Sequence, residues 1–300
     1  MTQNFTPRLS TTDWNEEWKN LQVARRKVDN SAYWDKRSKT FSTKDAPNAY
    51  VDRFLELARI EPGETVFDMG CGTGALSVPL GKEGHKVVAA DFSRGMLDAL
   101  QAELGDKGIT TVFPKLMSWE DDWEAEGVRE GMTDIAIASR SIAVSDMKAA
   151  LMRLTSVARR RVCITLSTGS SPRMDERILG DIGIKNEFGN DFLYAFNILV
   201  NEGIMPEVCY IKSTRSDTFD SVQEAYEDFS RMALDAMADK DSPEAAAALE
   251  RLRAWTEEHL IDNPDAGSLD RKGSPQKKLK LDYERIVTWA FLAWDTARLR

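Results

Sequence analysis

Residues 65–91 read TVFDMGCGTGALSVPLGKEGHKVVAAD, and this stretch decides the fold. Its first residues, Thr65 to Asp68, are β-branched and apolar, as expected for a buried parallel strand. A glycine-rich turn and a predicted helix follow, and a second buried strand, Lys86 to Ala90, ends at Asp91. Alternate glycines let the main chain turn sharply and leave bare backbone for a ligand. Because ligands of open α/β sheets bind at the carboxyl ends of the strands, this stretch predicts a binding site at that edge.

The glycine spacing narrows the class of ligand. A dinucleotide site has the pattern G-x-G-x-x-G and receives a pyrophosphate at the helix N-terminus. Here the pattern is G-x-G-x-G, and Asp68 stands two residues before the first glycine, where a carboxylate repels a pyrophosphate but suits an ammonium group. Asp91 is placed to accept hydrogen bonds from ribose hydroxyls. A ligand with an amino acid at one end and a nucleoside at the other is S-adenosylmethionine.

The loop DMGCGTG, residues 68–74, resembles the first motif of the class I S-adenosylmethionine-dependent methyltransferases, D/E-x-G-x-G-x-G, at every fixed position. The resemblance implies an α/β, three-layer αβα Rossmann-like fold around a mostly parallel seven-stranded sheet with an antiparallel last strand. It also implies S-adenosyl-L-methionine as cofactor and S-adenosyl-L-homocysteine as product. Residues 194–204 are similar to a functionally uncharacterised bacterial small-molecule methyltransferase subgroup, which supplies no substrate.

The resemblance also implies which residues contact the cofactor. Residues 92–96 resemble the family's D-x-S-x-x-M-L pattern, in which Met96 would lie against adenine, although plain core packing explains Met96 equally well. Ser118 and Trp119 follow the third predicted strand and would contact the adenine ring. The expected cofactor-binding residues are Asp68, Gly70, Cys71, Gly72, Thr73, Gly74, Asp91, Phe92, Ser93, Met96, Ser118, Trp119, Ser139 and Arg140.

The sequence gives fewer indications of the residues that contact the methyl acceptor than of those that bind the cofactor. The segment around Tyr33 and Trp34 resembles an aromatic and basic lid found before the first strand in several methyltransferases, but aromatic packing with surface charges is the alternative. Arg140 would hold a carboxylate or phosphate, or else point to solvent or form an ion pair. The catalytic group stays unknown, with Tyr33, Arg140 and Tyr194 as candidates. The expected substrate or lid residues are Tyr33, Trp34, Arg37, Ser141, Tyr194 and Asn197, of which Tyr194 and Asn197 are either buried and satisfied or substrate-facing.

Composition excludes several classes of protein. The net charge of −9 over 300 residues argues against a nucleic-acid partner, which needs a basic footprint. The run Arg159–Arg161 is expected to be a solvated helix end. After the fourth predicted strand, the chain lacks the N/D-P-P-Y motif that is typical of enzymes methylating amino groups of nucleic-acid bases. No metal is expected, because the sequence has no H-E-x-x-H pattern or cysteine cluster.

Three cysteines without a C-x-x-C pair indicate a reducing compartment. Without a signal peptide or a long apolar run, we expect a cytoplasmic protein with no membrane partner. A homodimer is one oligomeric state that the sequence leaves open.

Three segments are expected along the chain. Residues 1–45 form an N-terminal helical lid segment, 46–168 the S-adenosylmethionine-binding core, and 169–300 the completion of the sheet with helical cap insertions for substrate specificity. Residues 284–294 are either the antiparallel last strand or a tail helix. The resulting hypothesis is a methyltransferase that acts on a small-molecule acceptor by in-line displacement. A protein methyltransferase and a non-catalytic S-adenosylmethionine-binding regulator are the alternatives.

Overall fold

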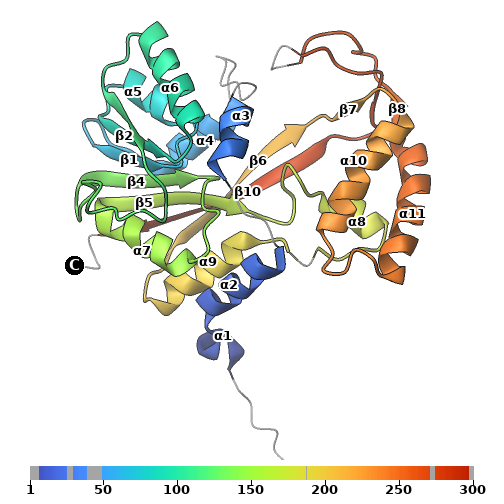
Figure 1. Ribbon diagram of the computed structural model, residues 1–300, viewed down its shortest axis with the longest axis horizontal. Helices are drawn as coiled ribbons and strands as arrows, with labels where there is room; N and C mark the ends of the chain where they lie inside the picture. The colour runs from blue at the N-terminus through green and yellow to red at the C-terminus, as the bar shows by residue number, and fades with distance from the viewer. Residues whose placement is uncertain (1–6, 26–29, 39–48, 187, 271–273, 297–300) are drawn as a thin grey trace, which may run out of the picture. The chain divides into compact units, whose positions relative to one another are not determined.

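The computed structural model describes residues 7–25, 30–38, 49–186, 188–270 and 274–296 (Figure 1). The chain divides into two compact units, and each is described by itself. The first comprises Met1–Leu166, Phe192–Cys209 and Ala290–Arg300. The second comprises Ser167–Asp191 and Tyr210–Trp289. The first boundary lies beside the predicted end of the cofactor-binding core at residue 168, and the chain crosses between the units several times.

A seven-stranded sheet organises the first unit. Its strands are β1 (Val66–Met69), β2 (Val87–Asp91), β3 (Val112–Leu116), β4 (Thr133–Ser139), β5 (Ala158–Ser167), β6 (Glu207–Arg215) and β10 (Arg285–Asp295). They lie in the order β3-β2-β1-β4-β5-β10-β6, and the strand pairs from β3 to β5 are parallel. The last strand, β10, runs antiparallel to β5, because the Thr296 N–H donates to the Arg160 carbonyl while the Thr288 N–H donates to that of Ser170. This sheet confirms the predicted fold class and the strand alternative for residues 284–294.

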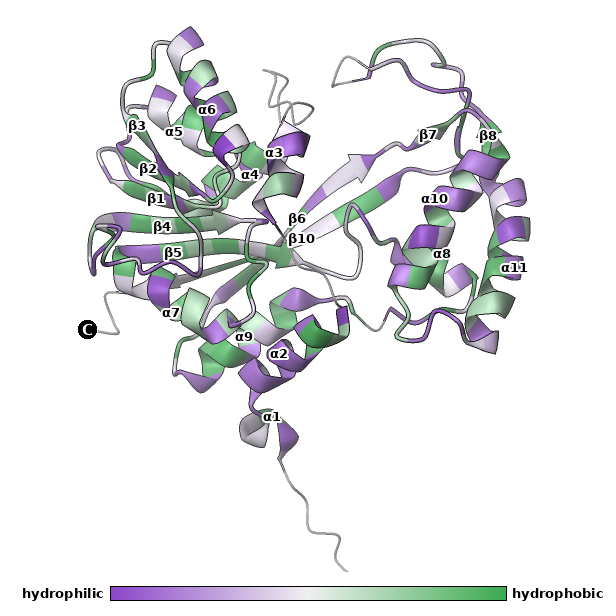
Figure 2. Ribbon diagram, viewed as in Figure 1, coloured by the Kyte–Doolittle hydropathy of each residue, from purple (hydrophilic) through white to green (hydrophobic). Residues whose placement is uncertain are grey.

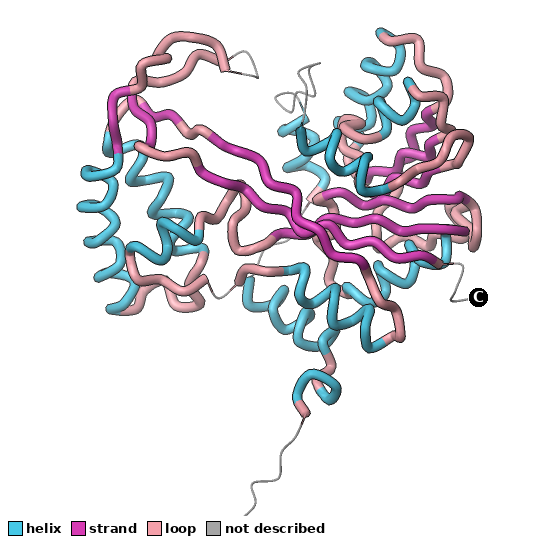
Figure 3. Tube along the Cα trace, turned by 180° about the vertical axis from the view of Figure 1, so that it is seen from behind, coloured by secondary structure: helices cyan, strands magenta, loops and turns pink. Residues whose placement is uncertain are grey.

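Helices cover both faces of this sheet, so the first unit has three layers (Figures 1 and 3). Burial explains why: β1 is buried along its whole length, and β4 and β5 are hydrophobic over most of theirs (Figure 2). On one face lie α4 (Ala49–Ala58), α5 (Ser77–Lys82) and α6 (Arg94–Asp106). On the other face lie α2 (Trp14–Arg25), α7 (Met147–Val157) and α9 (Asp191–Asn201). Two short helices, α1 (Arg8–Thr11) and α3 (Ser31–Ser38), complete the N-terminal part.

Side chains at the helix ends fix where several helices begin. The hydroxyl of Ser93 accepts a hydrogen bond from the Met96 N–H at the start of α6, and the Asp146 carboxylate accepts one from the Ala149 N–H at the start of α7. These caps satisfy amide groups that have no partner within the helix. The indole of Trp18 on α2 donates to the Val144 carbonyl (2.8 Å), which anchors that helix on the unit.

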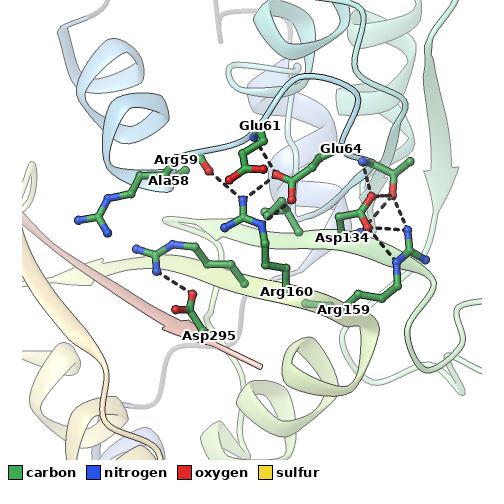
Figure 4. A network of polar contacts seen from close by, with 12 residues as sticks. Ala58, Arg59, Glu61, Glu64, Asp134, Arg159, Arg160 and Asp295 are labelled. Carbon is green, nitrogen blue, oxygen red and sulfur yellow. Dashed lines mark hydrogen bonds and ion pairs between the residues drawn. The ribbon is translucent and has the colours of Figure 1, made fainter. Parts of the chain in front are cut away.

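Three consecutive arginines begin strand β5, and each binds a carboxylate (Figure 4). The residues therefore belong to a strand rather than to the expected solvated helix end. Their guanidinium groups join the amino-terminal end of the sheet to neighbouring loops and to β10. The pairs are Arg159–Asp134, Arg160–Glu64 and Arg161–Asp295.

The second unit has its own hydrophobic core. It contains α8 (Glu176–Asp181), α10 (Val222–Asp235), α11 (Pro243–His259) and a small sheet of β7 (Thr218–Phe219), β8 (Leu260–Asp262) and β9 (Leu279–Leu281) in the order β7-β9-β8. Phe229 and Trp255 pack edge to face at the centre of this core, with ring centroids 5.8 Å apart. Helices α10 and α11 pack against each other along this core.

Candidate active site

A cavity opens at the carboxyl ends of β1, β2 and β4, within the first unit. It encloses about 890 Å³, including the part that is open to solvent. Its wall is formed by the glycine loop after β1, by the residues that follow β2, β3 and β4, and by Trp34 of α3. The cavity therefore lies at the sheet edge where the sequence analysis expects the ligand.

The glycine loop, which joins β1 to α5, has a left-handed backbone conformation that residues with a side chain rarely adopt. Gly70, Gly72 and Gly74 have φ angles of 75°, 56° and 90°, all in the left-handed region. A Cβ atom on Gly70 would lie 2.2 Å from the Cβ of Ser141, and one on Gly74 would lie 2.4 Å from Leu100 Cδ1. A Cβ atom on Gly72 would meet nothing within 4 Å. Two of the glycines are thus required by packing, whereas Gly72 presents bare backbone in the wall of the cavity.

Asp68 is the buried carboxylate of this loop. It is 2% exposed and lines the cavity, and its Oδ2 accepts a hydrogen bond from the Ser77 hydroxyl (2.6 Å). Burial raises the pKa of Asp68 to about 7, and the hydrogen bond from Ser77 opposes this rise. Nearby, the buried Oγ1 of Thr73 has no hydrogen-bond partner among the described residues. A buried acid and an unsatisfied hydroxyl in one wall fit a ligand with an ammonium group and other polar atoms.

Asp91 closes the opposite side of the glycine loop. Its Oδ2 accepts from the Gly72 N–H and its Oδ1 from the Ser93 N–H, both at 2.9 Å. Burial raises the pKa of this carboxyl group, while the backbone hydrogen bonds lower it. A carboxylate has about four acceptor positions, so Asp91 keeps the capacity to accept from two ribose hydroxyls. Ser93 does not line the cavity, because its hydroxyl caps α6.

Aromatic and methionine side chains form the part of the cavity wall next to Asp91. Phe92, Met96, Ser118 and Trp119 line the cavity as expected for an adenine site. The Trp119 indole donates to the Ser141 carbonyl (3.1 Å), which fixes one edge of its ring. Aromatic and methionine side chains of this kind can pack against a purine ring.

Four further residues of the cavity wall were not expected from the sequence. Ala75 and Leu76 lie in the wall because they belong to the turn before α5, which begins at Ser77. Met69 and Met117 each lie at the end of a strand, where an apolar side chain is naturally taken for core.

Polar groups gather at the end of β4. Ser139, Arg140 and Ser141 all line the cavity, and Arg140 adopts a left-handed backbone with φ of 57°. Its guanidinium lies over the ring of Tyr50, 4.2 Å from the centroid, in a cation–π contact. The Tyr50 hydroxyl in turn shares 2.6 Å hydrogen bonds with the hydroxyls of Ser139 and Thr165. The sequence did not indicate a place for Tyr50 beside the site. Its ring belongs to the apolar face of α4, and the residues that bind its hydroxyl lie far away in the sequence.

Several predicted residues lie away from the cavity. Tyr33 is exposed and packs edge-on against Trp34, so only the second member of this aromatic pair reaches the wall. Tyr194 packs edge-on against Trp14 and Trp18, with centroid distances of 6.3 and 5.7 Å. Both tyrosines thus make aromatic packing contacts, and neither lines the cavity.

Two other predicted residues, Asn197 and Gly74, do not form the wall either. Asn197 donates its side-chain N–H to the Leu193 carbonyl (2.7 Å), one turn earlier on α9. Gly74 faces Leu100 instead of the cavity. The side chain of Arg37 lies outside the described residues. In the part of the chain that the structure describes, no three His, Cys, Asp or Glu side chains gather as metal ligands. None of the described helices has the length and apolar character to cross a bilayer.

Comparison with known proteins identifies the class. Residues 66–161, which contain the glycine loop and both acids, match the family described as a methyltransferase domain. An uncharacterised protein of Haemophilus influenzae is 33% identical over 200 residues, which cover 65% of this chain and 70% of that protein. The chain belongs to the class I S-adenosylmethionine-dependent methyltransferases, and S-adenosylmethionine is its cofactor.

More distant relatives and solved structures also match the chain. A malonyl-[acyl-carrier protein] O-methyltransferase of Serratia marcescens is 32% identical over 132 residues, 43% of this chain and 47% of that enzyme. Among solved structures, the YcgJ protein of Bacillus subtilis matches with a TM-score of 0.49 at 13% identity, covering 82% of this chain and 97% of that one. The geranyl diphosphate C-methyltransferase of Streptomyces coelicolor matches with a TM-score of 0.46 at 12% identity, covering 96% and 99%.

Proposed function

We propose that this enzyme transfers the methyl group of S-adenosylmethionine to a small-molecule acceptor. The observation that carries the proposal is the composition of one cavity. Its wall holds the acids and glycines that suit the donor and also a separate polar group at the end of β4, formed by Ser139, Arg140 and Ser141. A bound donor supplies an electrophilic methyl group on a sulfonium. The acceptor would approach from the β4 side.

The residues of the chain contribute by holding and enclosing the reactants. The Asp68 carboxylate would hold the ammonium group of the donor, and Asp91 would accept hydrogen bonds from its ribose. In-line displacement needs the nucleophile close to the methyl carbon and little water nearby. The apolar side chains of Trp34, Met69 and Trp119 in the cavity wall would exclude water from the reacting atoms.

Arg140 favours an acceptor that carries a carboxylate or a phosphate. Its guanidinium is fixed over the Tyr50 ring beside the hydroxyls of Ser139 and Thr165. A planar guanidinium in a fixed orientation recognises such anions with two parallel hydrogen bonds. Two matched relatives are named after their acceptors: the malonyl-[acyl-carrier protein] enzyme and a nocamycin O-methyltransferase of Saccharothrix syringae.

Incubation with methyl-labelled donor tests the acceptor class. The purified chain is mixed with labelled S-adenosylmethionine and with separate low-molecular-weight and macromolecular fractions of a cell extract. We expect label in the low-molecular-weight fraction, and none when Gly72→Val replaces the wild type, since a valine side chain would occupy the donor site. Label confined to macromolecules would favour a protein methyltransferase. Donor binding without label in any fraction would favour a non-catalytic regulator.

We also propose a cytoplasmic location and no nucleic-acid or membrane partner. The thiols of Cys71, Cys163 and Cys209 are free, as suits a reducing compartment. The acidic net charge of −9 and the carboxylates bound to the arginines of β5 leave little basic surface there. Light scattering of the purified protein would distinguish a monomer from a homodimer.

A further inference from the structure

Helix α3 is attached to the first turn of α6 through one carboxylate. Oδ1 of Asp35 accepts hydrogen bonds from the Ser93 hydroxyl (2.6 Å) and from the Gly95 N–H (3.0 Å). The first turn of α6 has no acidic residue of its own, so Asp35 supplies negative charge to that helix end from a different helix. Charge-assisted hydrogen bonds and the helix dipole both favour a carboxylate there. The same two hydrogen bonds lower the pKa of Asp35, which keeps it ionised at neutral pH.

Gly95 gives independent evidence that this contact is specific. Its φ angle lies outside the left-handed region, so its own backbone does not require glycine. A Cβ atom at this position would lie 3.1 Å from the Asp35 Cα, 3.2 Å from the Asp35 carbonyl oxygen and 2.8 Å from the Ser38 hydroxyl. The absence of a side chain is therefore what allows the backbone of α3 to approach α6 so closely (Figure 1).

The contact is connected to the donor site along two routes. Trp34, the neighbour of Asp35, forms part of the cavity wall. Ser93, which donates to Asp35, also donates its N–H to Oδ1 of Asp91, and the other oxygen of Asp91 accepts from the Gly72 N–H. A continuous chain of hydrogen bonds thus runs from α3 to the glycine loop.

We propose that Asp35 is a positioning residue for the methyl donor. It holds α3 on α6 so that Trp34 covers the donor, and through Ser93 it orients the carboxylate of Asp91. We call the contact among Asp35, Ser93 and Gly95 the α3–α6 latch. Asp35 does not line the cavity, so its effect reaches the donor only through Trp34 and Asp91. Opening the latch should therefore shorten the residence time of the donor.

Binding of S-adenosylhomocysteine to latch variants tests this proposal. Calorimetry gives Kd, stopped-flow fluorescence gives the dissociation rate, and hydrogen–deuterium exchange reports on the amides of residues 31–38. We expect Asp35→Ala to raise Kd about tenfold, mainly through faster dissociation, because two charge-assisted hydrogen bonds are lost. Asp35→Asn keeps an acceptor oxygen without the charge, so about a threefold rise is expected. In both variants, residues 31–38 should exchange faster than in the wild type.

Gly95→Ala opens the latch without removing the carboxylate and should reproduce the effect of Asp35→Ala. Gly105→Ala is its matched control, because Gly105 lies on the same helix and its added Cβ would meet no atom within 4 Å. Lys36→Ala, at an exposed position of α3, is the control for Asp35. Both controls should bind S-adenosylhomocysteine like the wild type.

The result that overturns the proposal is equally definite. If Asp35→Asn and Gly95→Ala fold with a wild-type circular dichroism spectrum and leave Kd and the dissociation rate unchanged, Asp35 does not position the donor. Faster hydrogen–deuterium exchange of residues 31–38 together with unchanged binding of S-adenosylhomocysteine would also overturn the proposal. The test does not depend on the acceptor, so the small-molecule hypothesis can fail while the latch stands, and the reverse also holds.

Discussion

The hydroxyl of Ser77 donates a 2.6 Å hydrogen bond to the buried carboxylate of Asp68, on the floor of the donor cavity. This bond only partly offsets the effect of burial, which raises the pKa of Asp68 to about 7. In the ligand-free protein the group is therefore about half protonated at neutral pH. An ammonium group placed beside it would favour the ionised form, so ligand binding is coupled to loss of a proton.

We predict that S-adenosylhomocysteine releases about half a proton when it binds at pH 7, and that its affinity rises as the pH increases from 6 to 8. Calorimetry in buffers with different ionisation enthalpies measures the released proton. Asp68→Asn should bind more weakly and show no dependence on the buffer. A wild-type binding enthalpy that is the same in all buffers would contradict the assigned role of Asp68.

The raised pKa of Asp68 also affects stability. Because the folded pKa lies above the unfolded value, its contribution to stability is complete below about pH 4 and is lost as the pH rises through about 7. We expect Asp68→Asn to raise the Tm of the ligand-free protein at pH 8, where the native acid is ionised and buried. Thermal unfolding at pH 5 and pH 8 checks this, since the gain should shrink at the lower pH.

Asp91→Ala should weaken binding of S-adenosylhomocysteine about 100-fold, because two ribose hydroxyls and two backbone N–H groups lose their acceptor. Asp91→Asn should fall between this variant and the wild type. Titration calorimetry measures both affinities. Wild-type affinity in Asp91→Ala would place the ribose elsewhere.

Gly70→Ala should destabilise the first unit by about 2–4 kcal/mol, through backbone strain and overpacking against Ser141. The added Cβ would lie 2.2 Å from the Ser141 Cβ, so Ser141→Gly should relieve the clash but not the strain. Urea unfolding of both single variants and the double variant forms a double-mutant cycle. Strictly additive effects would show that the two residues do not collide.

Arg285 offers a test in the second unit, where its buried side chain binds Asp175 and Asp217. Arg285→Ala leaves the buried Asp175 without its cation, while Asp217 keeps its ion pair with Arg215, and should cost about 3–5 kcal/mol of unfolding free energy. Arg231→Ala is the matched control: its exposed pair with Asp228 should contribute less than about 1 kcal/mol. Equal losses in the two variants, measured by urea unfolding, would refute a special role for the buried arginine.

The donor half of the site was predictable from the sequence because its requirements are local. A left-handed turn needs glycine, and a buried acid beside it needs a positive or polar ligand, so Asp68, Gly72 and Asp91 stand out within one stretch. The strand order follows from the same resemblance. Trp34 was predicted from the resemblance as a lid residue, whereas the hydrogen bonds of its neighbour Asp35 to Ser93 and Gly95 are visible only in the structure.

Other parts depend on contacts between distant residues and were missed. The hydroxyl of Tyr50 meets Ser139 and Thr165, and nothing near Tyr50 in the chain indicates either partner. In the sequence, Tyr194 is a polar residue on an apolar helix. In the structure, Trp14 and Trp18 pack against its ring. The small sheet of the second unit consists of strands only two or three residues long, too short to show alternation.

The place of β10 in the sheet has a consequence for biosynthesis. This strand comes from residues 285–295 yet lies between β5 and β6, so both neighbours are made long before the strand that separates them. At about 5–20 residues per second, the ribosome leaves the edge of β5 unpaired for several seconds after that strand emerges. An unpaired hydrophobic edge is prone to join another chain. Nascent chains of this enzyme should therefore depend on chaperones until residue 295 has emerged.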